Sequence, residues 1–410
     1  MILLNTSLLT ILYKMKVFSD IHNCDENSIS GSLKEAIRDI VKREEYVTYK
    51  LNIGDLPQSG GNYLATLVRV EIKGQTVDGD KETNIIVKNI LQGDHLEFFS
   101  LSNIHSRELF FYNELSKMFT KLQDEAKIPV NERYKMAKCY EESNSEFIIL
   151  ENLSRNGFVT PDRMDPVSFS FAKLTIQQMA RLHALSLVLK NKRPQYFDSK
   201  IKPLRTPVQF NTALENCMKN FCNISTECLN NDMKKKTETF IATIGETLKR
   251  HMLDTSIGCL CHGDLKSTNI LKKINGNEVS EVVFIDYQMS FYGNPLMDIM
   301  YFIFSATDQP FRRNHLETIK NLYYDTIKTF LGYFEMDVED HFPRKIYEQL
   351  YKDSLTYGLI IGICFLPLSF AASDDIPDFS KASPEIFKVD PRLKSRLDGI
   401  IEDFTQWGYL

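Results

Sequence analysis

The spacing of hydrophobic residues divides the chain into a strand-rich N-terminal part and a mainly helical remainder. In SLKEAIRDIV, residues 32–41, apolar residues recur at the three- and four-residue intervals of an amphipathic helix. Ser32 and Glu35 have the spacing of a capping box and predict the start of this helix. A second helical period runs through SRELFFYNELSKMF, residues 106–119.

Between residues 50 and 153 the other apolar stretches predict β-strands. Residues 51–72 hold an alternating segment after the turn formers SGGN, which predicts a hairpin with a glycine tip at Gly60 and Gly61. ETNIIVKNIL and SEFIILENL predict two further strands. We therefore expect an α+β protein with a β-rich lobe over residues 29–153 and a mainly helical lobe over residues 154–410. Residues 1–28 are expected to form a flexible leader.

Composition indicates an ordinary globular protein, since 43% of the 410 residues are hydrophobic and 25% are charged. A net charge of -5 provides no basic surface for nucleic acid or anionic membranes. The eight cysteines lack CxxC spacing, which favours reduced thiols over a metal site. The apolar N-terminus and residues 358–371 are both short for a bilayer span, so we expect no stable membrane insertion and a cytoplasmic location. A signal peptide is disfavoured but stays open, and the oligomeric state is undetermined.

Two polar clusters stand beside apolar strands in the second half of the chain. CHGDLKSTNIL, residues 261–271, presents Asp264 and Asn269 from one short loop, and VVFIDYQ ends its apolar run on Asp286. One such aspartate alone would most simply cap a turn. Two carboxylates and a carboxamide at the ends of neighbouring β segments instead form an oxygen-rich set that suits Mg²⁺.

These segments resemble the ecdysteroid kinase-like family of arthropods, which is related to choline kinases and aminoglycoside phosphotransferases. The resemblance rests on pieces that occur in the family's order: SGGNYLATLVRV, SRELFFY, IILENLSRNGF, LCHGDLKSTNIL, VVFIDYQMSFYGNPLMDIMYFIFSA and YGLIIGICFLPL. It implies a bilobal protein kinase-like fold that uses ATP and Mg²⁺ to phosphorylate a hydroxyl of a small molecule. The implied acceptor is an ecdysteroid or a similar hydroxylated lipophilic compound. The chain departs from the family pattern at Lys266 and Thr268, where Trp and Asn are usual.

The resemblance also implies roles for individual residues. Asp264 would orient the acceptor hydroxyl and take up its proton, while Asn269 and Asp286 would hold Mg²⁺. Lys88 would contact the α- and β-phosphates, and Glu108 would position the lysine. Taken alone, the last two residues are better explained as a surface lysine and an ordinary helical glutamate; the presence of Asp264, Asn269 and Asp286 favours the nucleotide-binding roles.

Two further elements would contact the nucleotide. Gly60 and Gly61 would bring backbone N–H groups to the phosphates, although any tight hairpin uses such a pair. Backbone groups of Glu151, Asn152 and Leu153 would pair with the adenine at a hinge between the lobes, or the segment is a structural linker.

Other residues and other functions stay in view. Asp298 is expected to brace the catalytic loop, and His183 to be a hydrogen-bonded core residue, so neither is expected to be catalytic. A choline-like or aminoglycoside-like acceptor is the alternative within the kinases. A nucleotide-binding pseudokinase is the alternative outside the enzymes, although retention of Lys88, Asp264 and the metal-binding residues disfavours it.

Overall fold

The structure, a computed structural model, describes residues 29–55, 65–90, 98–372, 375 and 387–410. These residues form two compact units. The first is built from the described parts of residues 1–58, 65–90 and 138–156, and the second from those of residues 91–137 and 157–410. The leader and the glycines of the predicted hairpin tip, Gly60 and Gly61, lie outside the described residues. The lobe boundary predicted after residue 153 stays a prediction; residues 98–137 pack with the second unit here.

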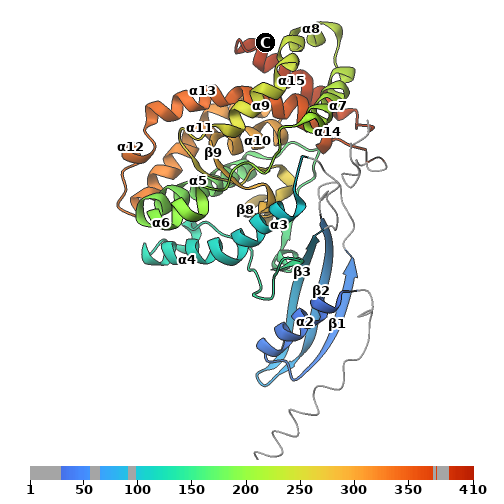
Figure 1. The fold of residues 1–410 in the computed structure, drawn as a ribbon, viewed down its shortest axis with the longest axis vertical. Helices are drawn as coiled ribbons and strands as arrows, with labels where there is room; N and C mark the ends of the chain where they lie inside the picture. The colour runs from blue at the N-terminus through green and yellow to red at the C-terminus, as the bar shows by residue number, and fades with distance from the viewer. Residues whose placement is uncertain (1–28, 56–64, 91–97, 373–374, 376–386) are drawn as a thin grey trace, which may run out of the picture. The chain divides into compact units, whose positions relative to one another are not determined.

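The first unit is an antiparallel sheet with one helix on it. Its elements are α2 (Gly31–Arg43), β1 (Thr48–Asp55), β2 (Ala65–Thr76), β3 (Gly79–Ile90) and β4 (Phe147–Glu151). The strands pair in the order β1-β2-β3-β4, with Val70 opposite both Ile53 and Ile85. The predicted hairpin over residues 51–72 is therefore present as β1 and β2 (Figure 1).

The core of this unit lies between α2 and the sheet. Leu33, Ile37 and Ile40 are buried on the helix and share one cluster with Val70 and Ile85 of the sheet, so the predicted amphipathic period is confirmed.

The predicted cap of α2 was two residues too late. The Ser30 hydroxyl caps the helix by accepting from the Leu33 amide, while Ser32 donates its hydroxyl proton to Glu146. A contact 114 residues away, invisible to local pattern, takes Ser32 out of the capping role.

The second unit is mainly helical and contains two small sheets. Its helices are α3 (Leu101–Phe110), α4 (Ser116–Glu125), α5 (Phe169–Lys192), α6 (Pro194–Tyr196), α7 (Thr212–Cys228), α8 (Asn231–Ala242), α9 (Ile244–Leu253), α10 (Leu296–Ala306), α11 (Gln309–Gly332), α12 (Val338–His341), α13 (Arg344–Ile360), α14 (Leu366–Ser369) and α15 (Arg392–Gln406). Its strands are β5 (Phe158–Val159), β6 (Cys259–Cys261), β7 (Ile270–Asn275), β8 (Glu278–Phe284) and β9 (Phe291–Gly293).

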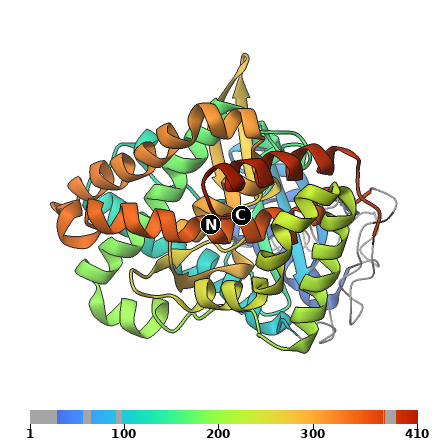
Figure 2. The ribbon, with the colours of Figure 1, turned by 90° about the horizontal axis from the view of Figure 1, so that it is seen from above.

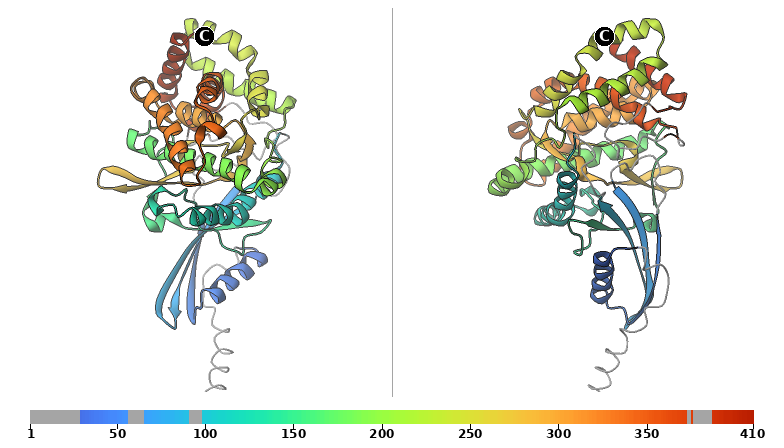
Figure 3. Two further views of the ribbon diagram at one scale, coloured as in Figure 1. Left: turned by 90° about the vertical axis from the view of Figure 1, so that its left-hand side faces the viewer. Right: turned by 45° about the vertical axis from the view of Figure 1, so that its right-hand side comes forward.

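The strands of this unit carry the segments that the sequence singled out. β6 pairs with β9, and β7 pairs with both β5 and β8, all antiparallel. Figures 2 and 3 show the β7–β8 hairpin standing out from the helices of the unit. The polar loop 262–269 runs from the end of β6 to the start of β7, so both of its ends are held by paired strands.

The predicted helix at 106–119 is confirmed and is longer than expected. It comprises α3, a π-helical turn at Phe111–Leu115 and α4. Phe111 stacks on Tyr287 with ring centroids 4.4 Å apart, and the Arg107 guanidinium donates to the Ser290 carbonyl at 2.8 Å. This helix therefore packs directly on the segment that follows Asp286.

The expected fold class, α+β with a β-rich N-terminal part and a mainly helical remainder, is confirmed. Residues 358–369 belong to α13, a π-helical turn at Ile361–Phe365 and α14, and most of them are buried. Among the described residues, no helix combines the length and the apolar character needed to cross a bilayer.

Because β1 and β2 approach closely at Gly74, we expect that adding one methyl group there destabilises the protein. A Cβ at Gly74 would lie 1.9 Å from the Thr48 carbonyl oxygen, which is backbone and cannot rotate away. We expect Gly74→Ala to lower the free energy of unfolding by about 1–3 kcal/mol, measured by urea denaturation. The control is Gly31→Ala, where a Cβ meets nothing within 4 Å. Equal stability of the two variants would contradict the register.

Candidate active site

The loop that carries Asp264 is held by a buried carboxylate. Asp298, on α10, is 1% exposed; its Oδ2 accepts from the His262 amide at 2.7 Å and its Oδ1 from the Gly263 amide at 2.9 Å. Gly263 has φ +85°, and a Cβ there would lie 2.3 Å from the Met289 carbonyl oxygen. A side chain at this position is thus excluded both by conformation and by space. The predicted bracing role of Asp298 is confirmed by these contacts.

His183 connects this carboxylate to the core. Its imidazole is fully buried, with Nδ1 2.7 Å from the Tyr323 hydroxyl and Nε2 3.1 Å from Asp298 Oδ2. Cys261 completes a buried group of three potential ligand atoms. Its thiol donates to the Asn294 carbonyl, however, and burial raises its pKa well above the ordinary value, so the sulfur is a protonated thiol. Hydrogen bonding accounts for this cluster, and His183 is the core histidine that the sequence predicted.

Strand pairing brings the two predicted metal residues to neighbouring backbone positions. Ile270 at the start of β7 pairs with Phe284 at the end of β8, and the Ile285 amide donates to the Asn269 carbonyl at 3.0 Å. Asn269 is therefore hydrogen-bonded to the residue that directly precedes Asp286. Asp286 has φ 70° and ψ 61°, a left-handed conformation that is uncommon outside glycine and typical of functional turns.

The side chain of Asn269 is oriented by the loop itself. Its Nδ2 donates to both the main-chain oxygen and Oδ2 of Asp264, at 2.8 and 2.9 Å. Because the nitrogen is used in this way, the amide oxygen is the atom left to act as a metal ligand. This oxygen and the Asp286 carboxylate are of the ligand types that Mg²⁺ prefers.

His262 is neutral and joins the two segments. Its Nε2–H donates to the Ile285 carbonyl at 3.0 Å, and its Nδ1 accepts from the Asp264 amide at 3.4 Å. These two hydrogen bonds require a proton on Nε2 and none on Nδ1. Burial lowers the pKa of the imidazole, and the nearby charges of Asp298, Asp264 and Asp286 offset only part of that effect.

Asp264 is held as a carboxylate. Burial by itself raises its pKa, but the charge of Lys266 and a hydrogen bond from the Tyr301 hydroxyl outweigh burial, so the net pKa is lowered. Lys266 Nζ lies 3.2 Å from Asp264 Oδ2. The group can therefore accept a hydrogen bond from an alcohol at neutral pH.

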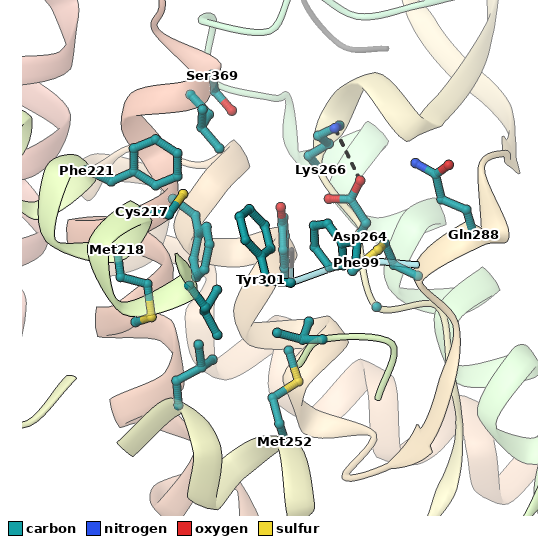
Figure 4. Close-up of a pocket in the computed structure, with 18 of the residues that line it drawn as sticks. Phe99, Cys217, Met218, Phe221, Met252, Asp264, Lys266, Gln288, Tyr301 and Ser369 are labelled. Carbon is teal, nitrogen blue, oxygen red and sulfur yellow. Dashed lines mark ion pairs between the residues drawn. The ribbon is translucent and has the colours of Figure 1, made fainter. Parts of the chain in front are cut away.

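Asp264 opens onto an apolar pocket of about 170 Å³ within the second unit (Figure 4). Side chains from several helices and from the segment after residue 97 line it, including Phe99, Met218, Phe221, Met252, Tyr357 and Phe365. Asp264, Lys266, Gln288 and Tyr301 supply polar groups at the end of the pocket that Figure 4 shows around the ion pair. A cavity with apolar walls and a few convergent polar groups is typical of a small-molecule site.

The residues predicted to bind nucleotide are distributed over both units. Lys88 lies on β3 of the first unit and Glu108 on α3 of the second, and the two are 7% and 1% exposed. Charged side chains are rarely buried unless paired, so the interpretation of Lys88 as a surface lysine is wrong. Their mutual pairing stays a prediction.

The hinge segment is in the first unit, and part of its backbone is already bonded. The Glu151 amide donates to the Lys138 carbonyl at 2.9 Å, and the Asn152 amide to the Asn84 carbonyl at 3.0 Å. Recognition of a base by this segment would therefore use carbonyl groups or the Leu153 amide. That role stays a prediction.

Sequence reasoning did not find Tyr301. The residue lies three positions after Asp298 on α10, so both side chains are on the same face of the helix and reach the same loop. This three-residue spacing from Asp298 could have identified Tyr301 from the sequence. The apolar lining gave no signal, because its residues come from helices that are distant in sequence.

An aspartate–asparagine loop, a second aspartate after the β7–β8 hairpin, and a β-rich unit joined to a helical one are typical of a kinase-like phosphotransferase. The family model described as the ecdysteroid kinase-like family matches residues 59–336. The chain belongs to this family and is a small-molecule kinase by that membership. Comparison with curated proteins yielded no significant match.

Three of the solved structures similar to the chain are kinases or phosphotransferases of small molecules. An ethanolamine kinase from Plasmodium vivax is 16% identical, with 97% of this chain and 94% of that chain covered and a TM-score of 0.42. The choline kinase LicA from Streptococcus pneumoniae is 14% identical, with coverages of 78% and 98% and a TM-score of 0.33. A spectinomycin phosphotransferase, solved with ADP and spectinomycin, is 12% identical, with coverages of 81% and 88% and a TM-score of 0.38.

The bonds of Asp298 predict the effect of replacing it with asparagine. Asparagine has one acceptor oxygen, so its NH₂ group would face one of the loop amides and leave that donor unsatisfied. We expect Asp298→Asn to lower the free energy of unfolding by about 1–3 kcal/mol and to accelerate amide hydrogen exchange at His262 and Gly263. The exposed Asp325→Asn on α11 is the control. Unchanged exchange in Asp298→Asn would refute the bracing role.

The neutral state of His262 predicts a pH dependence of stability. Its folded pKa lies below the ordinary value of 6.5, so the unfolded chain binds more protons and stability is lost as pH falls below 6.5. His262→Gln keeps a donor for the Ile285 carbonyl but cannot titrate. We expect it to flatten the plot of unfolding free energy against pH by up to about 1.4 kcal/mol per pH unit.

His251 provides an internal comparison for this experiment. Burial lowers its pKa to about 4, and its Nε2 lies 2.8 Å from the Thr356 hydroxyl. His251→Gln should flatten the same plot between pH 6.5 and about 4. A flattening in His251→Gln without one in His262→Gln would show that His262 is not held neutral.

Proposed function

We propose that the protein is an ATP- and Mg²⁺-dependent kinase that phosphorylates a hydroxyl of a lipophilic small molecule, with an ecdysteroid as the leading acceptor. The observation that supports this most directly is the position of Asp264. Its carboxylate lies at an apolar pocket and is hydrogen-bonded to Asn269, which neighbours Asp286 across the β7–β8 pairing. One short loop can thus contact both the acceptor hydroxyl and a metal ion bound to the phosphate.

In the proposed reaction the acceptor oxygen forms a bond to the γ-phosphorus while the bond from that phosphorus to the bridging oxygen of ADP breaks. Asp264 accepts the hydroxyl hydrogen bond and finally its proton. The carboxylate is a weak base, but in a loose transition state the proton leaves late, so orientation matters more than basicity. Mg²⁺, when bound, would neutralise charge on the phosphate oxygens, and Asn269 and Asp286 are the residues that would hold it.

Lys88 and Glu108 complete the proposed nucleotide site. Lys88 would contact the α- and β-phosphates and Glu108 would aim its side chain, which is consistent with the burial of both groups. Glu151, Asn152 and Leu153 would present backbone groups to the adenine, and Gly60 and Gly61 would approach the phosphates. A cytoplasmic location, where ATP is abundant, fits this activity.

The pocket favours a lipophilic acceptor over the choline-like alternative. Recognition of a quaternary ammonium group uses aromatic faces together with negative charge. Aromatic residues line this pocket, but Asp264 is the one carboxylate among its described lining residues, and it is paired with Lys266. The family membership adds the ecdysteroid class as the first acceptor to test.

The decisive measurement is ADP release with a panel of hydroxylated lipophiles, with and without Mg²⁺, followed by mass spectrometry for a product heavier by one phosphate. Asp264→Asn should reduce kcat by about 10²–10⁴-fold, the usual contribution of a positioned acid or base. Asp286→Asn should abolish turnover while weakening nucleotide binding far less. Asp325→Asn, an exposed change of the same chemistry, should leave both unchanged. Nucleotide binding without turnover on any alcohol would favour the pseudokinase alternative instead.

A further inference from the structure

The acceptor pocket has an unusual charge arrangement around Asp264. Among the described lining residues this is the one carboxylate, whereas two side chains, Lys266 and Arg163, are cationic. The Arg163 guanidinium donates to the main-chain oxygens of Ser369 and Ala371. The described wall therefore carries more positive than negative charge.

Lys266 is held next to the carboxylate by the loop rather than by chance contact at the surface. It lies two positions after Asp264 in the same turn, and its side chain is 17% exposed, against 13% for Asp264. Its ammonium lies 3.2 Å from Oδ2, the oxygen that also accepts from the Asn269 amide (Figure 4). Partial burial weakens solvent screening, so the pair interacts more strongly than an exposed ion pair would.

This pairing decides what kind of acceptor the pocket can attract. A cationic alcohol would need a carboxylate whose charge is available to it, and here Lys266 already neutralises that charge. It would also approach a like charge at short range in a poorly screened site. An uncharged alcohol meets neither obstacle, since its hydroxyl needs only an oxygen acceptor and its body needs the apolar wall.

We propose that Lys266 is a specificity-determining residue that makes the pocket select uncharged over cationic alcohols. This inference rests on the proposed function, because it takes the pocket to be the acceptor site. Lys266 stands where the sequence departs from the pattern of the family it resembles, so the selectivity would belong to this chain in particular. The residue acts through its charge, which arginine would preserve and glutamine would remove.

The test uses a matched pair of short alcohols that are identical except that one ends in a tert-butyl group and the other in a trimethylammonium group, so that the cation stays near Lys266 when the hydroxyl lies at Asp264. Binding of each to the full chain is measured by calorimetry at low ionic strength without nucleotide. The wild-type protein should bind the uncharged alcohol at least about tenfold more tightly. Lys266→Gln should reduce this preference at least about fivefold by tightening the binding of the cation, because the negative charge of Asp264 then has no cationic partner in the loop.

Two controls separate charge from structural damage. Lys266→Arg should keep the wild-type preference. Lys235→Gln removes the same charge from an exposed position on α8 and should also leave the preference unchanged. If Lys266→Gln binds both alcohols with the wild-type ratio, the inference is wrong, and the same holds if Lys266→Arg loses the preference.

The outcome can be told apart from that of the proposed function. Selectivity that responds to Lys266 in a protein that never releases ADP would overturn catalysis but support the inference. Turnover of uncharged alcohols with a preference that ignores Lys266 would support the proposed function and overturn the inference.

Discussion

The site of this protein depends on one buried carboxylate that binds backbone. Asp298 accepts hydrogen bonds from the amides of His262 and Gly263, and the buried His183 imidazole lies 3.1 Å from its Oδ2. A polar group is costly to bury unless its hydrogen bonds are satisfied, and here both carboxylate oxygens have a partner. The loop that follows can therefore present Asp264 in a single conformation.

From this anchor the functional groups follow by short covalent and hydrogen-bonded links. His262 joins the loop to the end of β8 through the Ile285 carbonyl, and Asn269 joins it through its own main-chain oxygen. Asp286 is the next residue along. Preorganisation of this kind is how an active site stabilises charge without rearranging during the reaction. The aromatic packing of Phe111 on Tyr287 holds the same segment from the side of α3.

The pocket beside the loop combines two chemical demands. Its apolar wall is drawn from α7, α9, α13 and the π-helical turn after α13. Its polar end needs one group that accepts a hydroxyl hydrogen bond. Lys266 lowers the pKa of Asp264 at this end, so in the function proposed above one ion pair would both keep the hydroxyl acceptor ionised and limit its attraction for cations.

The sequence by itself determined the class of fold and the chemistry of the loop. Alternation and helical period located the β1–β2 hairpin, strands β3 and β4 and the helix over residues 106–119, because local hydrophobic spacing reflects which face of an element is buried. The aspartates and Asn269 were recognisable because their order along the chain matches the ends of consecutive strands. Only the tertiary structure decided that Ser30 rather than Ser32 caps α2, that Tyr301 bonds to Asp264, and that an apolar pocket opens beside it. These features arise from contacts between residues far apart in sequence, and a local pattern does not predict which distant side chains will be in contact.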